Sequence, residues 1–391
     1  MDHLFSSFGD IGMNQSVWRA WCIVGYLLIP THAVVADDAP HWNPAKTCVF
    51  VAGLLEWQHP EMFKPFPAAK INRRDEQLVH FFEHAGVPKD RISYLQDSAA
   101  TKVRLVSEFG KFLDRTQAGD LLVFYFCGHG FRDRKTDETW FANYDAGEVN
   151  GSAWNVREII AEIEQRFHGR QALLLADCCH SGSLYDEARK HHKSQIAYAV
   201  LTSSYSHNTS TGHWTFSDAV LAGLRGDATV DLDDDHRVTL AEVAKNSESE
   251  LAFIEGQKSM FFSAEGFPAN TVIGQARQPL KPYLGARIEV EYKGKWYKAK
   301  TIDADGTNRK VHYVNFDSSW DEWVGHERRR PYQPPQFATG DKVEVRWEVD
   351  KKWYPATVQD GWYGLHFVRY GGYTASADEW VGPDSIRLQG E

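Results

Sequence analysis

Hydrophobic residues in the first two-thirds of the chain fall into short continuous runs that alternate with amphipathic stretches. Runs without polar alternation predict strands buried on both faces, as in a parallel sheet covered by helices. These strands are predicted at residues 47–53, 91–95, 120–127, 171–176 and 197–204. Apolar residues at helical spacing predict helices at 75–86, 99–113, 156–167 and 215–224. Such alternation indicates a doubly wound, mostly parallel α/β sheet.

The last third of the chain has a different pattern, in which apolar and polar residues alternate and whole segments recur. The segment that begins at Gly285 is repeated from Gly340, and the motif DEWV occurs once in each copy. The alternation in RIEVEY and KVEVRW predicts half-buried strands, and about five short strands in about 50 residues suit a small closed barrel. We therefore predict two SH3-like β-barrels, at residues 283–332 and 337–389.

The N-terminal segment has the layout of an export signal. An apolar run of 11 residues from Ala20 to Pro30 follows Arg19 and precedes a stretch of small residues. The run is too short to span a bilayer, and this order is typical of a cleaved secretory signal. We expect cleavage after Ala36, a signal peptide at residues 1–36, and a secreted or extracytoplasmic mature protein without a transmembrane segment. The other interpretation is a buried N-terminal helix.

Composition narrows the classes of function. The chain has 391 residues, which corresponds to two or three domains, and its aromatic content of 13% excludes a disordered chain. A net charge of −10 argues against a nucleic-acid binder that works through a positive field. Basic and acidic residues are equal in number from Lys281 to Glu391, so the predicted barrels carry no net positive charge and nucleic acid is a disfavoured partner.

Reactive side chains follow two of the predicted buried strands. The run that ends at Phe126 is followed by CGHG, and the run that ends at Ala176 is followed by DCCHSG. Because parallel strands finish at the same edge of a sheet, His129 can meet a cysteine from the second motif. An imidazole that takes the proton of a thiol makes a competent nucleophile, and the amide of Gly130 can point at a developing oxyanion. The cysteine spacing fits neither a disulfide scaffold nor a metal site.

These motifs resemble those of the caspase and metacaspase clan of cysteine peptidases. His129 precedes Cys179 by 50 residues, a separation given for caspases, and the HSG form is similar to that of metacaspases and their bacterial relatives. The resemblance extends from Thr47 to Ile273, and we place the caspase-like domain at residues 45–275. It implies that Cys179 is the nucleophile, that His129 is the base, and that the chemistry requires no cofactor.

The resemblance also implies a preference for basic substrates. In metacaspases an Asp two positions before the nucleophile accepts a basic side chain, and it corresponds here to Asp177. Asp75 matches a second pocket carboxylate, and Ser204 is a further candidate for substrate binding. Two buried carboxylates favour Arg or Lys through charge-assisted hydrogen bonds. The competing hypothesis is cleavage after Asp, because in caspases an arginine near the position of Arg73 and Arg74 binds that residue.

A short polar and basic stretch at residues 183–195 predicts an exposed loop. In caspase-like enzymes the activating cut falls just after the nucleophile strand. Candidate self-cleavage sites in this stretch are Arg189, Lys190 and Lys193. The alternative, an ordinary surface loop, has equal support.

One acidic segment has the ligand spacing of a calcium-binding loop. Asp231, Asp233 and Asp235 are followed at the twelfth position by Glu242, as in an EF-hand. His236, however, stands where such a loop needs glycine, and no flanking helix pair is evident. Several metacaspases need calcium, so the resemblance makes calcium a candidate activator. The alternative is a solvated acidic loop before a helix.

The two C-terminal repeats resemble Tudor-knot, chromo-barrel and agenet modules, which can hold methylated lysine in an aromatic cage. Exposed candidates for such a cage are Tyr313, Phe316 and Trp320 in the first copy and Phe367, Tyr370 and Tyr373 in the second. Matching tryptophans are instead expected to fill the barrel cores. These tryptophans are Trp296, Trp323, Trp353 and Trp380. We interpret the pair as a docking module for an unknown protein, peptide or envelope polymer.

Together, these features predict an exported caspase/metacaspase-like cysteine endopeptidase that acts on protein or peptide substrates. Cys179 would form a thioester with the substrate, His129 would move the proton, and the amides of Cys179 and Gly130 would hold the oxyanion. The alternative is a non-catalytic or scaffold protein whose tandem barrels bind a protein, peptide or nucleic acid ligand.

Overall fold

The computed structural model describes residues 39–391 except 148–149, 192–193, 280, 349 and 391. The predicted signal peptide at residues 1–36 lies outside the described residues. No helix in the described part of the chain is long and apolar enough to cross a membrane.

A six-stranded main sheet in the described residues has the order β10-β8-β7-β3-β1-β2. Its strands are β1 (Thr47–Gly53), β2 (Ile92–Gln96), β3 (Leu121–Cys127), β7 (Gln171–Asp177), β8 (Ala197–Thr202) and β10 (Met260–Ser263). Within this sheet, β10 pairs antiparallel with β8 and the other pairs are parallel. The mostly parallel α/β fold predicted from the continuous apolar runs is confirmed. All residues of β1 are buried, as expected for a strand covered on both faces.

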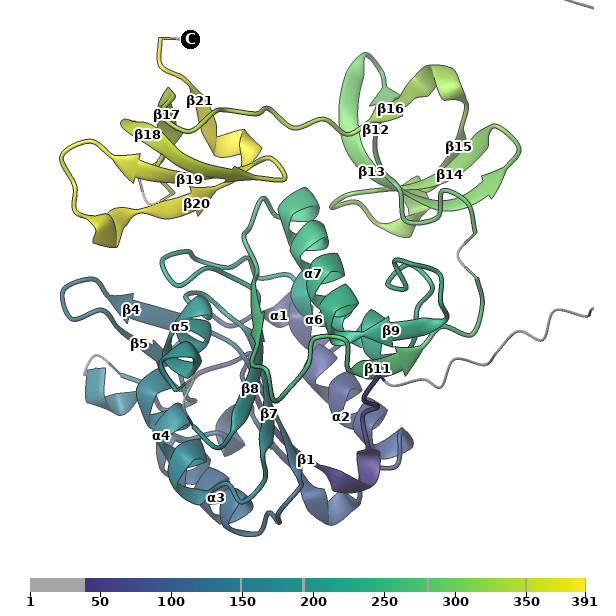
Figure 1. Cartoon of the computed structure of the whole chain (residues 1–391). Helices are drawn as coiled ribbons and strands as arrows, with labels where there is room; N and C mark the ends of the chain where they lie inside the picture. The colour runs from purple at the N-terminus through teal and green to yellow at the C-terminus, as the bar shows by residue number, and fades with distance from the viewer. Residues whose placement is uncertain (1–38, 148–149, 192–193, 280, 349, 391) are drawn as a thin grey trace, which may run out of the picture. The chain divides into compact units, whose positions relative to one another are not determined.

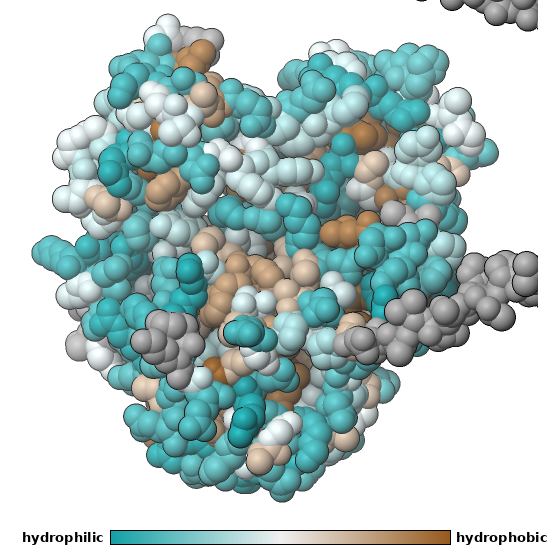
Figure 2. All heavy atoms as spheres, viewed as in Figure 1, coloured by the Kyte–Doolittle hydropathy of each residue, from teal (hydrophilic) through white to brown (hydrophobic). Residues whose placement is uncertain are grey.

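Helices cover both faces of this sheet (Figure 1). They are α2 (Arg74–His84), α3 (Lys102–Asp114), α4 (Val156–Arg166), α5 (Gly182–Lys190), α6 (Thr215–Leu224) and α7 (Leu240–Ile254). Successive strand residues point to opposite faces, so Phe50 and Phe124 join the core under α3, α4 and α5, whereas Val51 and Tyr125 join the core under α2, α6 and α7. The face visible in Figure 2 is mostly hydrophilic, in keeping with apolar residues gathered in these two layers.

A small antiparallel sheet that the hydrophobic pattern did not predict lies beyond the end of β3. It contains β4 (Gly130–Asp133), β5 (Glu138–Phe141) and β6 (Trp154–Asn155), in that order. Its strands are too short to show a periodic pattern, although Phe141 and Trp154 are fully buried. Shorter elements of the same domain are α1 (Pro67–Lys70), β9 (Arg237–Thr239) and β11 (Val272–Gln275).

The C-terminal repeats form two small antiparallel barrels of matching topology. The first contains β12 (Arg287–Tyr292), β13 (Lys295–Asp305), β14 (Asn308–Tyr313), β15 (Glu322–Val324) and β16 (Arg329–Pro331). The second contains β17 (Lys342–Arg346), β18 (Trp353–Trp362), β19 (Leu365–Tyr370), β20 (Glu379–Val381) and β21 (Ile386–Leu388). The strand orders β15-β14-β13-β12-β16 and β20-β19-β18-β17-β21 correspond strand for strand. The predicted pair of small β-barrels is confirmed.

The prediction that matching tryptophans fill the barrel cores was wrong. Trp296 and Trp323 are 40% and 47% exposed, whereas Tyr313 and Tyr370, expected at the surface, are 4% and 2% exposed. The two-residue period of a strand explains the difference, because Ala299 on β13 faces the core and Trp296 lies on the opposite side. Trp353 and Trp380 are half-buried.

Candidate active site

The ends of β3 and β7 bring the two sequence motifs together. Cys127 pairs with Asp177 at the last step of the parallel ladder, so both strands end at the same level. Just beyond, a Cβ atom built on Gly130 would lie 2.0 Å from the carbonyl oxygen of Cys179. Only glycine permits this approach, because any larger residue would clash with the backbone after β7. The segments that carry His129 and Cys179 are therefore packed backbone to backbone.

His129 is held by a main-chain carbonyl and two aromatic rings. Its Nε2 atom lies 2.8 Å from the carbonyl oxygen of Lys64, and its ring lies 4.5 Å from Trp57 and 4.6 Å from Phe66 between centroids. A carbonyl only accepts, so Nε2 carries the proton and Nδ1 is left as the basic atom. Burial lowers the pKa of His129, and the bond to Lys64 opposes that shift. The imidazole is thus kept neutral and in one tautomer.

The thiol of Cys179 is engaged by the backbone of Ser210. The amide of Ser210 donates to Sγ at 3.2 Å, and Sγ lies 3.6 Å from the carbonyl oxygen of the same residue. Burial raises the pKa of the Cys179 thiol, so the resting sulfur is protonated. Among the hydrogen bonds of the described residues, none joins His129 to Cys179. Because such contacts often tighten only when substrate is bound, this geometry describes a resting site.

The turn after Cys179 is fixed by the segment that follows β8. His180 has a positive φ of 58°, its amide donates to the carbonyl of Asn208 at 2.8 Å, and its Nδ1 lies 3.0 Å from the carbonyl of Ser206. Burial lowers the pKa of His180 to about 4. Ser204 is fully buried and its hydroxyl donates to the carbonyl of Cys178 at 3.0 Å. In contrast to the expected role in substrate binding, Ser204 braces the nucleophile turn.

Asp177, two residues before Cys179, lines a narrow pocket. The cavity has a volume of about 30 Å³ and is bounded by Leu55, Phe66, Ala69, Cys127, Gly128, Asp177, Thr211, Gly212, His213 and Trp214. Ser217 donates to Oδ2 of Asp177 at 2.6 Å, and burial raises the pKa of this carboxyl to about 7. About one water molecule fits in such a volume, so the cavity must widen before it can admit a side chain.

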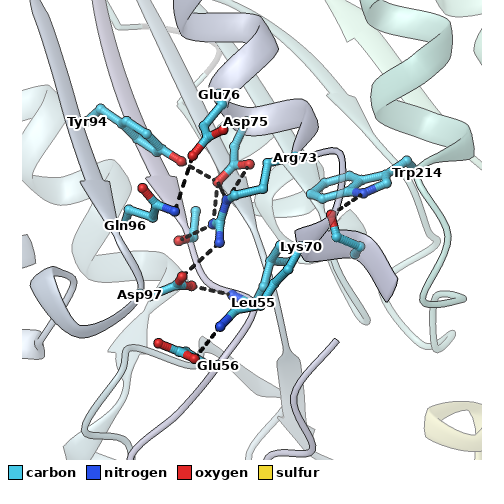
Figure 3. A network of polar contacts seen from close by, with 12 residues as sticks. Leu55, Glu56, Lys70, Arg73, Asp75, Glu76, Tyr94, Gln96, Asp97 and Trp214 are labelled. Carbon is cyan, nitrogen blue, oxygen red and sulfur yellow. Dashed lines mark hydrogen bonds and ion pairs between the residues drawn. The ribbon is translucent and has the colours of Figure 1, made fainter. Parts of the chain in front are cut away.

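Asp75, the second expected pocket carboxylate, is neutralised within the protein (Figure 3). The guanidinium of Arg73 donates to Asp75 at 2.6 Å, to Asp97 at 2.7 Å and to the carbonyl of Gly53 at 3.0 Å, while Tyr94 donates to Asp75 at 2.8 Å. Both Arg73 and Asp75 are buried. Neither is open to substrate in this structure, which differs from both expectations, a second acidic wall and an arginine that binds Asp. The adjacent Arg74 pairs with Asp218 instead.

The stretch after the nucleophile was expected to be an exposed loop, and this prediction was wrong. Residues from Gly182 to Lys190 form α5, because Leu184 and Ala188 lie four residues apart and are both buried. Arg189 and Lys190 lie in its last turn, where they contact Tyr185 and Glu187. A helical segment must unwind before a protease can cut it. The third candidate self-cleavage site, Lys193, lies outside the described residues.

Three of the four predicted calcium ligands come together. Carboxylate oxygens of Asp231, Asp233 and Asp235 lie within 4.8 Å of one another, and His236 adopts a positive φ of 66° where a glycine was thought necessary. The carboxylate of Glu242 is used elsewhere. It accepts from the amides of Leu232 and Thr239, both at 2.8 Å, and completes a capping box at the start of α7.

Several residues of this site carry no sequence signal. The contribution of Lys64 is a main-chain oxygen, which any residue could supply. Ser210 likewise reaches the thiol through its backbone. The aromatic residues around His129 could have been noticed as a cluster of Trp57, Phe63 and Phe66, although their spacing fits no regular element.

Residues 77–188 match the metacaspase, peptidase C14 domain. This match includes His129 and Cys179, and it confirms the resemblance seen in the two motifs. Residues 340–390 match the Agenet domain, which confirms the assignment of the second repeat. The chain thus contains a segment similar to the metacaspase peptidase domain and a C-terminal segment similar to the Agenet domain.

No curated protein matches the chain. The chain is similar to the crystal structure of protein GSU0716 from Geobacter sulfurreducens, with 14% identity and a TM-score of 0.42 over 59% of this chain and 100% of that one. Similarity at this level adds nothing to the assignment of the metacaspase domain.

Proposed function

We propose that the protein is a cysteine endopeptidase that cleaves peptide bonds after Arg or Lys. The observation that carries the proposal is the meeting of Gly130 and Cys179 at the end of neighbouring parallel strands, with His129 held in one tautomer beside them. The match of this segment to the metacaspase peptidase domain supports the same reaction class.

The proposed reaction starts from a neutral His129 imidazole and a protonated Cys179 thiol. Nδ1 of His129 accepts the thiol proton as Sγ of Cys179 bonds to the substrate carbonyl carbon. The amides of Cys179 and Gly130 stabilise the oxyanion. The imidazolium then returns the proton to the leaving amine, which leaves a thioester. Water, deprotonated by His129, attacks the thioester and releases the new carboxylate together with the thiol.

The basic specificity rests on Asp177. It is the carboxylate that lines the narrow pocket, two residues before the nucleophile, and an incoming Arg or Lys would remove the penalty of ionising it in a buried position. Arg73 is already bound by two carboxylates and a carbonyl, so we place cleavage after Asp second.

A panel of fluorogenic peptides tests the proposal. The peptides differ only in the residue before the bond, namely Arg, Lys, Asp or citrulline, and are offered to the full chain and to its Cys179→Ala variant with and without calcium. We expect release after Arg and Lys by the parent and none by the variant. Turnover that survives in Cys179→Ala would overturn the peptidase assignment, and release after Asp would overturn the pocket assignment.

The second candidate function is a binding protein whose barrels dominate. The observation in its favour is the engagement of the Cys179 thiol by Ser210 rather than by His129. A parent chain that binds peptides with basic residues but releases no product under any condition in the panel would support this function.

Two accompanying proposals concern location and activation. We place the mature protein outside the cytoplasm, because of the signal-like segment at residues 1–36, and sequencing of the mature N-terminus tests this placement. We also propose calcium as an activator held by Asp231, Asp233 and Asp235, since clustered carboxylate oxygens are the donors that calcium prefers. We also propose self-cleavage in the segment after α5. It would appear as two fragments of the parent chain and would be absent from the Cys179→Ala variant.

A further inference from the structure

The second barrel has an aromatic pocket where it meets the peptidase domain. The cavity of about 260 Å³ is lined by Trp347, Tyr354, Tyr370, Tyr373, Asp350 and, from the peptidase domain, Arg134. The rings of Trp347 and Tyr370 lie 5.2 Å apart at an angle of 67°, so they form two walls of one box. The hydroxyl of Tyr354 donates to Asp350 at 2.7 Å, which places a carboxylate at the rim.

The two repeats differ at a position next to this pocket. In the first barrel Trp320 packs on Phe316 and Tyr292, with ring centroids 5.4 Å and 6.0 Å apart. The motif DEWV follows at the same distance in both repeats, so the position of Trp320 corresponds to Ala377 in the second. The second barrel has no indole at this position, and the side chain of Arg134 lies among its aromatic rings, over Trp347.

Arg134 is a ligand of this pocket. It lies in the turn between β4 and β5, and its guanidinium carbon is 4.9 Å from the centroid of the Trp347 ring. A cation over the face of Trp at this distance is attracted by the ring quadrupole. The neighbouring Arg132 donates to the carbonyl of Ser376 at 3.3 Å, so the hairpin is tied to the barrel at two points.

The same barrel holds the loop that engages the nucleophile. His207 bonds the carbonyl of Asp378 at 2.7 Å, and Asn208 bonds the backbone of Trp380 in both directions, at 2.8 Å and 3.0 Å. Thr209 donates to Glu348 at 2.6 Å. The next residue in the loop is Ser210, whose backbone contacts the Cys179 thiol. A continuous set of contacts therefore runs from the barrel to the nucleophile.

We propose that the aromatic pocket of the second barrel is a cation-binding site whose resting ligand is Arg134, and that a guanidinium or ammonium side chain entering the pocket displaces the hairpin and releases the loop from the Cys179 thiol. The site takes a basic side chain of a peptide. A substrate or partner with several basic residues would therefore bind the pocket, release the loop from the Cys179 thiol, and reach the active site. The regulatory half of this inference rests on the proposed peptidase function, whereas the binding half does not.

The binding half is tested without turnover. Calorimetry of the full chain carrying Cys179→Ala and Asp177→Asn, which remove the nucleophile and the other cation site, is run with N-acetyl-arginine methylamide and with its uncharged citrulline analogue. Adding Arg134→Ala removes the internal competitor and should tighten binding of the arginine probe roughly three- to tenfold, while Lys135→Ala in the same turn should not. Adding Ala377→Trp should abolish binding, and the first barrel shows that a tryptophan is accommodated at this position. Equal affinity in the Arg134→Ala and Lys135→Ala variants overturns the site.

The release of the thiol is measured by alkylation. The rate at which iodoacetamide labels Cys179 is followed by peptide mass in the otherwise unchanged chain, where the other cysteines of the described residues are buried. Arg134→Ala and Ala377→Trp should each raise this rate several-fold over Lys135→Ala. An unchanged rate overturns the coupling even if the probe binds as expected. If binding and alkylation change as expected but no peptide is cleaved, the coupling between the pocket and the Cys179 thiol is supported and the proposed peptidase function is contradicted.

Discussion

Nε2 of His129 lies 2.8 Å from the carbonyl oxygen of Lys64, and this contact decides which nitrogen can act as a base. The carbonyl holds the Nε2 proton, so the lone pair sits on Nδ1. The aromatic rings of Trp57 and Phe66 pack against the imidazole and hold it in that orientation. The group that orients the imidazole is thus a main-chain carbonyl.

Substitution of His129 by Gln should reduce kcat by about 10²–10⁴ while it leaves the fold intact, because only the proton acceptor is lost. Lys64→Ala is the matched control: it should keep most of the activity, since Lys64 acts through its carbonyl. Steady-state kinetics on an Arg peptide, together with circular dichroism, make the comparison. A large loss in Lys64→Ala would show that the side chain and not the backbone orients the base.

The raised pKa of Asp177 predicts how cleavage depends on pH. The carboxyl titrates at about 7 in the free enzyme, and its neutral form attracts a cation poorly. We expect kcat/KM for an Arg peptide to fall as pH drops through about 7, whereas a citrulline peptide should show no such limb. His129, whose pKa is lowered by burial, would give a limb at more acidic pH. Identical acid limbs for the two peptides would contradict the assignment of Asp177.

The raised pKa of Asp177 also predicts how stability depends on pH, in the direction opposite to that of cleavage. Its pKa rises from 3.8 to about 7 on folding, so the native state binds the proton more tightly and the free energy of unfolding falls as pH rises through that window. Asp177→Asn removes the ionisation and still accepts from Ser217. We expect it to raise the free energy of unfolding at pH 8 by up to about 4 kcal/mol, with little effect at pH 4.

Urea unfolding in a Cys179→Ala background measures this effect without self-digestion. The exposed Asp90 provides the control, because Asp90→Asn should not alter stability at either pH. If the Asp177→Asn variant is less stable than the chain with Asp177 at pH 8, the ionised carboxylate stabilises the fold, which would contradict the prediction that its burial is unfavourable.

The features that could be predicted from the sequence are the repeated C-terminal segments and the strands and helices whose apolar residues are buried. The strands that end at Cys127 and Asp177 were recognisable because both faces are covered, and the four helices predicted from spacing occur with ends that differ by at most three residues. Because parallel strands end at the same edge of a sheet, the sequence alone predicted that His129 and Cys179 lie near each other.

Other features depend on partners that no local pattern specifies. Arg73 and Asp75 each had a sequence-based role in the substrate pocket, yet their mutual ion pair satisfies both. α5 was missed because its basic end outweighed the short apolar spacing of Leu184 and Ala188. The outward direction of Trp296 follows from strand register, which a repeat alone does not fix.

Removal of Arg73 should destabilise the protein without changing its specificity. Arg73→Met leaves the buried carboxylates of Asp75 and Asp97 without their cation, a change that typically costs about 3–5 kcal/mol. Arg74→Met, which breaks an ion pair to the exposed Asp218, should cost less than about 1 kcal/mol. Urea unfolding compares the two, and the triple variant Arg73→Met, Asp75→Asn, Asp97→Asn should recover part of the loss. A changed preference among the Arg, Lys and Asp peptides in Arg73→Met would instead assign this arginine to substrate recognition.

Calcium titration separates the acidic cluster from the EF-hand spacing that first suggested it. Glu242 would be the most important ligand if the twelve-residue pattern applied, but its carboxylate caps α7 and lies outside the group formed by Asp231, Asp233 and Asp235. We therefore expect Glu242→Gln to lower stability by about 0.5–2 kcal/mol and to leave calcium affinity unchanged, whereas Asp233→Asn should weaken binding about tenfold with little effect on stability. Calorimetry with calcium chloride on the Cys179→Ala chain, paired with thermal unfolding, measures both quantities. Equal loss of affinity in the two variants would mean that the segment rearranges into a twelve-residue loop around the ion, and absence of binding in the parent would remove calcium from the proposed activation.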